Sequence, residues 1–183
     1  MSPIKNEEIL DVAVEASLAA SDIIMEAAHN PQIERVKKSG SDLVTHTDLA
    51  SERIIKSFII KNYPKHNILA EESEHKDNSS DYLWVIDPLD GTTNFIHGYP
   101  SYSVSIGVYY KNYPIVGVVL EMPHVKLYTA ITKKGAWCEG NKIQTSKTKT
   151  LKDSLLVTGF GYQHGGLWEK NMDLFKIDTD KCH

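Results

Sequence analysis

The sequence predicts an α+β fold, a layered α/β sandwich of helices and mixed, largely antiparallel sheets. Three observations predict it. The first part of the chain alternates helical with extended patterns, whereas the part after residue 100 is rich in strand-like alternation. The connections between these later strands are short, which favours antiparallel hairpins. A length of 183 residues suits one domain, expected over residues 1–183, with a sizeable core.

Helical patterns predict three amphipathic or capped helices. In residues 4–29 the apolar side chains recur at helical spacing, and Asn30-Pro31 ends the pattern. A second helix is expected directly after Thr47 or Asp48, either of which can cap its first turn. Leu167 to Ile177 form the third amphipathic pattern.

The strands are expected to be short. The segment 82–86 should stop at Asp87-Pro88, because proline fixes its own φ and donates no hydrogen bond to a sheet. The remaining strands are expected at residues 33–38, 43–45, 67–70, 102–110, 115–122, 126–132, within 136–141, and at 154–158.

Composition excludes several classes of protein. Hydrophobic residues make up 41% and charged residues 24% of the chain, which is ordinary for a globular protein. The net charge is −4 with scattered basic residues, so nucleic acid binding is not expected. Two cysteines without metal-ligand spacing favour a reducing compartment. No signal-peptide core or membrane-spanning run is evident, which predicts a cytoplasmic protein that does not bind membranes.

The stretch from Trp84 to Pro100 carries the strongest functional signal. An apolar strand runs into Asp87, a proline turn brings Asp90 to the same side, and two such carboxylates would repel each other. A hard divalent cation neutralises such a pair, because these cations prefer carboxylate, carbonyl and water oxygens. Gly91 and Thr92 can then begin a helix whose free N–H groups face an anion.

Two further acidic positions are open to two interpretations. On the residues alone, Asp48 is most simply a helix cap, and Glu71-Glu72 is a solvated loop after a strand. If the strand ending at Ala70 points to the same place as Asp87, however, the glutamate pair supplies a third carboxylate.

Three ordered blocks now carry a resemblance to a known family. The run Asp87-Pro-Leu-Asp-Gly-Thr-Thr-Asn-Phe95, preceded by Ala70-Glu-Glu-Ser73 and by Asp42-Leu-Val-Thr-His-Thr-Asp48, resembles the inositol monophosphatase family of magnesium-dependent phosphatases. The resemblance extends from the first helix to about Gly161. It implies Mg²⁺ as the cofactor, a small phosphorylated polyol such as inositol monophosphate as the substrate, a homodimer, and inhibition by lithium.

The resemblance also implies roles for individual residues. The metal ligands would be Glu71, Asp87, the Leu89 carbonyl and Asp90, with Asp90 bridging two ions. Asp48 and Thr92, assisted by Glu71, would orient and deprotonate the attacking water. The substrate would contact Glu71, Leu89, Asp90, Gly91 and Thr92. Lys37 or Lys38 corresponds to a basic residue of the family, and neither receives a role.

The chain departs from the family pattern after its last expected helix. Family members continue with a Trp-Asp motif whose aspartate completes a second metal site, and no Trp-Asp dipeptide occurs here. This departure from the resemblance leaves room for a truncated or catalytically impaired family fragment that acts by binding or by subunit association, with little stability or turnover by itself. Fructose bisphosphate, histidinol phosphate and nucleotide 3′-phosphates remain alternative substrates.

Overall fold

The computed structural model describes residues 4–29, 35–39, 42–73, 77–159 and 165–179. Its contacts divide the chain into two compact units, Met1–Ile143 and Gln144–His183. The first unit contains every residue expected at the site. That all 183 residues form one domain remains a prediction.

The first unit is built on a sheet of seven strands within the described residues, in the order β3-β4-β5-β6-β7-β8-β9. β3 and β4 run parallel, and each later pair is antiparallel, which confirms the expected mixed, largely antiparallel α+β fold. A separate antiparallel pair is formed by β1 (Arg35–Ser39) and β2 (Asp42–Thr45). The seven strands are β3 (Asn67–Ala70), β4 (Tyr82–Asp90), β5 (Tyr102–Tyr110), β6 (Tyr113–Met122), β7 (Lys126–Ile131), β8 (Gly135–Cys138) and β9 (Asn141–Ile143).

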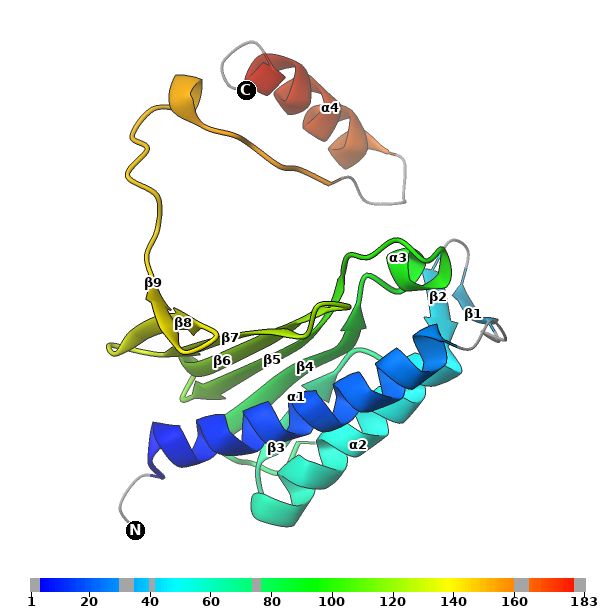
Figure 1. Cartoon of the computed structure of the whole chain (residues 1–183), viewed down its shortest axis with the longest axis vertical. Coiled ribbons are helices and arrows are strands. Elements are labelled where there is room, and N and C mark those ends of the chain that lie inside the picture. The colour runs from blue at the N-terminus through cyan, green and yellow to red at the C-terminus, as the bar shows by residue number, and fades with distance from the viewer. Residues whose placement is uncertain (1–3, 30–34, 40–41, 74–76, 160–164, 180–183) are drawn as a thin grey trace. The chain divides into compact units, whose positions relative to one another are not determined.

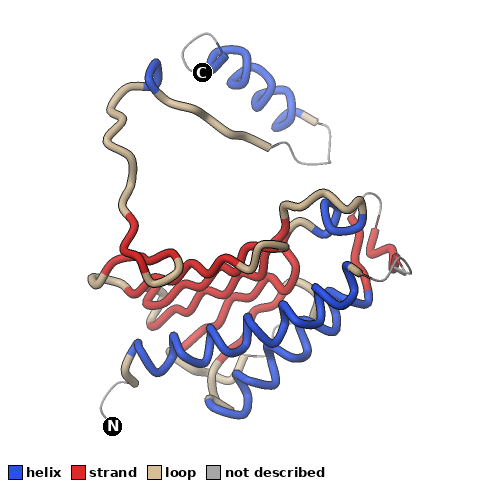
Figure 2. The backbone as a smooth tube through the Cα atoms, in the orientation of Figure 1, coloured by secondary structure: helices blue, strands red, loops and turns tan. Residues whose placement is uncertain are grey.

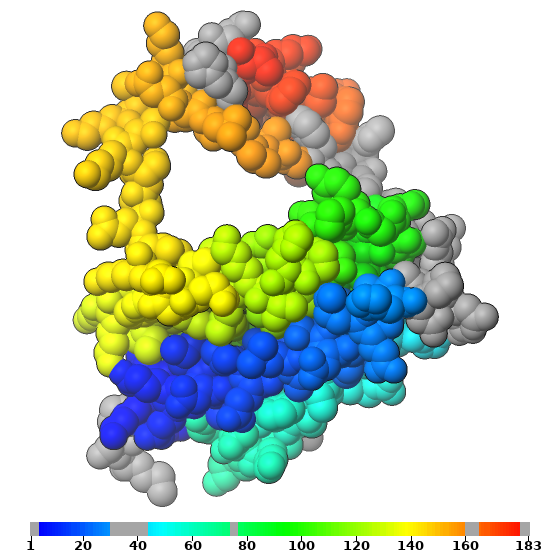
Figure 3. All heavy atoms as spheres, viewed as in Figure 1, coloured from blue at the N-terminus to red at the C-terminus, as the bar shows by residue number. Residues whose placement is uncertain are grey.

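Two long helices, α1 (Asn6–Ala28) and α2 (His46–Asn62), lie side by side along one face of this sheet (Figures 1 and 2). α1 contacts β5, β6 and β7. The space-filling view shows this helix, in blue, packed against the sheet (Figure 3). The strands turn alternate side chains toward the helices, such as Val104, Ile106 and Val108 of β5. The layer of buried side chains between the sheet and the two helices is the hydrophobic core. Burying one such side chain stabilises the fold by about 1.5–3 kcal/mol.

β4 does not stop at Asp87-Pro88 as expected but continues to Asp90. Asp87 is paired with Ser105 and Asp90 with Ser103, so three steps along β4 match two along β5. The extra residue makes a β-bulge, and a proline is tolerated there because the bulge interrupts the ladder. The bulge therefore carries the chain past the proline and keeps both aspartates at the end of one strand.

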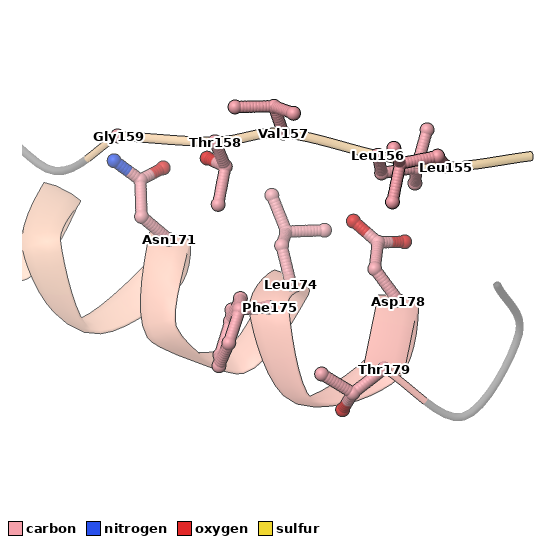
Figure 4. A pocket seen from close by; sticks show the side chains of 10 residues that line it. All are labelled: Leu155, Leu156, Val157, Thr158, Gly159, Asn171, Leu174, Phe175, Asp178 and Thr179. Carbon is pink, nitrogen blue, oxygen red and sulfur yellow. The ribbon is translucent and has the colours of Figure 1, made fainter. Parts of the chain in front are cut away.

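The second unit contains a short 3₁₀ turn, η1 (Leu151–Asp153), an extended segment and α4 (Gly166–Thr179). The expected helix at 167–177 is confirmed, but the expected strand at 154–158 is wrong, because this segment pairs with no strand among the described residues. A pocket of about 650 Å³ lies between the segment and α4. Figure 4 shows Leu174 directed toward the segment and Val157 directed away from α4. α4 has no fully buried side chain in the described structure.

No helix in the described ranges combines the length and the apolar character that a membrane span requires.

His66 is a buried titratable group at the end of the sheet where β3 and β4 begin. Its ring stacks between Tyr63 and Tyr82, with centroids at 4.6 and 4.4 Å, and Trp84 Nε1 donates a hydrogen bond of 3.0 Å to its Nδ1. Burial lowers the pKa of His66 to about 4 from its ordinary 6.5. The ring therefore accepts the Trp84 N–H as a neutral imidazole, and protonation opposes this arrangement.

We expect the contribution of His66 to the stability of the fold to decrease as the pH falls from about 6.5 to about 4, because the unfolded histidine binds a proton in this window and the folded one does not. The loss is at most about 1.4 kcal/mol for each pH unit. Chemical denaturation at a series of pH values measures it, with His66→Asn as the matched variant, since Asn offers an acceptor near the Nδ1 position and does not titrate. A constant stability difference between the two proteins over this window would contradict the assignment.

Candidate active site

Asp48 is placed by the junction between β2 and α2. The N-cap of α2 is Thr45 rather than Thr47 or Asp48, so the expected cap was misplaced. Thr45 Oγ1 accepts from the backbone N–H groups of Thr47 and Asp48, while Asp48 Oδ2 accepts from the Thr45 N–H at 2.8 Å and from the Thr45 hydroxyl. This reciprocal capping box explains why Thr45 is the cap, because it gives hydrogen-bond partners to the N–H groups of Thr45, Thr47 and Asp48 at the start of the helix. It also fixes the orientation of the Asp48 carboxylate.

The second oxygen of that carboxylate reaches across the fold to Thr92. Thr92 Oγ1 donates to Asp48 Oδ1 at 2.9 Å and lies 3.0 Å from the Leu89 carbonyl oxygen. Asp48 is 1% exposed, whereas Thr92 is half-buried. An Asp–Thr pair with one partner buried and the other open to solvent can orient a polar ligand at the hydroxyl.

Gly91 makes this placement of Thr92 sterically feasible. Its φ is +87°, in the left-handed region, and a Cβ there would lie 2.9 Å from the Ser101 carbonyl oxygen. Only glycine fits both conditions, and it lets β4 turn at once into α3 (Thr92–Ile96). The expected helix start at Thr92 is therefore present.

Two carboxylates come together because β3 and β4 are parallel. Ala70 is paired with Ile86, so Glu71, the first residue after β3, lies beside Asp87, the next residue of β4. Their side chains share a hydrogen bond. The strand that ends at Ala70 therefore points to the same place as Asp87.

The electrostatics around Asp87 reveals an excess of negative charge. Its pKa is raised to about 7, first by burial, then by the charges of Glu71 and Asp90, against a lowering by the Leu89 N–H, which donates to Oδ1 at 3.2 Å. Asp90 is more exposed, and its Oδ2 lies 3.4 Å from the Ser103 hydroxyl. Carboxylates that disfavour one another's charge are what a divalent cation compensates.

The donors do not already converge on one point. Among the described residues, no three Asp, Glu, His or Cys side chains are arranged as a metal site. The donor types at the end of β4 nevertheless fit a hard cation, since they are carboxylates together with the Leu89 carbonyl. The roles of these residues as ligands remain predictions.

Sequence reasoning missed one residue near the site, Glu52. It lies one turn after Asp48 on α2, is buried, and accepts the Glu72 N–H at 2.8 Å. No sequence signal distinguishes it from the solvated acids usual on a helix. Lys37 and Lys38 lie on β1, and their side chains fall outside the described residues.

The fold and the site together define an α+β protein with a cluster of carboxylates at the end of β4, the strand beside the edge strand β3. Comparison with known proteins gives the family. The model of the inositol monophosphatase family matches residues 5–183. The chain belongs to the inositol monophosphatase family.

Individual relatives agree with the family match. The chloroplastic phosphatase IMPL1 of Arabidopsis thaliana is 46% identical over 94% of this chain and 48% of its own length. The inositol-1-monophosphatase of Synechocystis is 41% identical over 95% of this chain and 61% of its own. The solved structure of the extragenic suppressor protein suhB from Bartonella henselae superposes with a TM-score of 0.90 at 26% identity, over 96% of this chain and 68% of that one. The chain thus spans about half to three fifths of the length of these two curated relatives.

Proposed function

We propose that the protein carrying this chain hydrolyses a small phosphate monoester with the help of Mg²⁺, most directly inositol monophosphate to inositol and phosphate. The observation that carries the proposal is the Asp48–Thr92 hydrogen bond beside the carboxylates of Glu71, Asp87 and Asp90. The similarity to an inositol-1-monophosphatase of Synechocystis supports the choice of substrate.

The ligands for Mg²⁺ would be the carboxylates of Glu71, Asp87 and Asp90 and the carbonyl of Leu89. These are the hard oxygen donors that Mg²⁺ prefers. When bound, Mg²⁺ supplies positive charge that stabilises the transition state and lowers the pKa of water at the site. The raised pKa of Asp87 supports this assignment, because a cation would offset the burial of the carboxylate and its repulsion by Glu71 and Asp90, which together raise it.

The residues of the chain would orient the water and remove its proton. Thr92 Oγ1 donates its proton toward Asp48, which leaves its lone pairs to accept a hydrogen bond from the attacking water. Asp48, held by the capping box, would then take up the proton through the Thr92 hydroxyl, with Glu71 assisting. The backbone N–H groups at Gly91 and Thr92 would contact the phosphate, alongside Leu89 and Asp90.

A comparison of substrates tests the proposal. Phosphate release from inositol monophosphate should exceed release from fructose bisphosphate, histidinol phosphate and nucleotide 3′-phosphates, and a chelator should abolish it. Phosphate release that is unchanged by the chelator would contradict the metal-dependent account. Faster release from another of these esters would identify that ester as the substrate in place of inositol monophosphate. The homodimer, the cytoplasmic location and the inhibition by lithium remain proposals, and the Arabidopsis relative is named as chloroplastic.

The two adjacent glutamates are expected to differ sharply. Glu71→Gln should weaken Mg²⁺ binding by at least about tenfold, because it removes a carboxylate ligand that lies beside Asp87. Glu72→Gln should change it little, because the ligand position is assigned to Glu71 and the substitution keeps the Glu72 backbone N–H that Glu52 accepts. Calorimetric titration of both variants with Mg²⁺ measures this, and equal losses would show that the assignment of Glu71 is wrong.

A further inference from the structure

α2 carries a second buried acid besides Asp48. Glu52 is 5% exposed, and both of its oxygens are engaged. Oε2 accepts the backbone N–H of Glu72 at 2.8 Å, and Oε1 accepts from Lys56 Nζ at 3.1 Å. Lys56 also donates to the hydroxyl of Ser73, so the pair contacts two consecutive residues beyond β3.

Both contacts converge on the segment that carries Glu71. β3 ends at Ala70, and the backbone from Glu71 to Ser73 lies beyond the strand. The Glu52 carboxylate and the Lys56 ammonium restrain this segment from the side of α2. A buried charge is stable only when paired and hydrogen-bonded, and Glu52 is paired with the neighbouring lysine, one turn away on the same helix.

We propose that Glu52, braced by Lys56, is a positioning residue that holds the backbone at Glu72 and thereby aims Glu71 toward Asp87. The inference rests on the proposed function, because it takes Glu71 as a cation ligand. One helix then positions two parts of the site, Thr92 through Asp48 and Glu71 through Glu52. The spacing of four residues sets both acids on the same face of α2.

The test compares Glu52→Ala, Glu52→Gln and the control Arg53→Ala in this 183-residue chain. Glu52→Ala should weaken Mg²⁺ binding by about 10- to 100-fold, the range found when a group that orients a ligand is removed. Glu52→Gln should restore part of the loss, because its amide oxygen can still accept the Glu72 N–H. Arg53 is exposed on the same helix, and its removal should leave the affinity unchanged.

A second readout needs no metal. Hydrogen exchange at the Glu72 amide, followed by NMR in metal-free protein, should be faster in Glu52→Ala than in the parent chain, with Glu52→Gln in between. Should Glu52→Ala not fold, Glu52→Gln and Lys56→Met carry both measurements, and each should raise the exchange rate and weaken binding by several-fold.

The outcomes separate the inference from the function. If the parent chain binds Mg²⁺ and folded Glu52 variants bind it equally well, the positioning role is overturned while the proposed function stands. Unchanged exchange at Glu72 would also overturn it. Weaker binding and faster exchange in Glu52→Ala, with both partly restored in Glu52→Gln, support it. A parent chain that binds no Mg²⁺ overturns the proposed function and the inference together.

Discussion

Thr92→Ala is expected to reduce phosphate release by about 10²- to 10³-fold in the protein that carries these residues, the scale of a lost proton-transfer group. The substitution removes the hydroxyl that donates to Asp48 at 2.9 Å and that would orient the attacking water. Folding should be retained, because Thr92 is only half-buried, so little packing is lost with its hydroxyl and γ-methyl groups.

Thr92→Ser is the matched control, since it keeps the hydroxyl and should keep most of the turnover. The measurements are initial rates of phosphate release and thermal melts of the three proteins. Normal turnover in Thr92→Ala with a normal melt would remove Thr92 from the mechanism. Equal loss in both variants would point to packing rather than to the hydroxyl.

Asp87→Asn and Asp90→Asn are each expected to abolish Mg²⁺ binding at this site. The amide keeps the shape of the carboxylate but lacks the charge that a hard cation requires. The metal-free fold should keep or gain thermal stability in Asp87→Asn, because the change removes a half-buried charge beside Glu71. Calorimetric titration with Mg²⁺ and thermal melts without metal measure the two effects.

Asp81→Asn provides the control for these variants. Asp81 is an exposed carboxylate that precedes β4 at its other end and pairs with Lys111 at 3.6 Å. Its substitution should leave the isotherm unchanged. If Asp87→Asn or Asp90→Asn binds Mg²⁺ with the affinity of the parent chain, the cation lies elsewhere in the protein.

Much of the fold could be predicted because its signals are local. Apolar periodicity placed α1 and α2, and alternation placed β5 and β6 close to their observed limits. The strand expected at 154–158 was wrong for a non-local reason. Leu155, Leu156 and Val157 favour an extended backbone, but a strand also needs a paired neighbour, which short apolar runs do not reveal.

The site shows the same division. The helix start at Gly91 could be predicted from residue types, since glycine readily adopts the left-handed φ that this turn requires. The expected strand end at Asp87-Pro88 was wrong, because a β-bulge carries β4 past the proline to Asp90. The cap of α2 was misplaced by a few residues because Thr45, Thr47 and Asp48 are all competent caps, and the reciprocal hydrogen bonds select Thr45. Glu52 escaped notice because its partner is a backbone N–H twenty residues later, and a backbone group carries no side-chain signature.

The account depends most on the claim that the end of β4 holds a divalent cation between Glu71, Asp87, Asp90 and the Leu89 carbonyl. A crystal of this chain grown with Mn²⁺, which scatters anomalously and shares the oxygen preference of Mg²⁺, tests it directly. We predict an anomalous peak at bonding distance from the Asp87 carboxylate and the Leu89 carbonyl oxygen, with Glu71 or Asp90 completing the shell. A peak only at other residues, or none at saturating Mn²⁺, would contradict the claim.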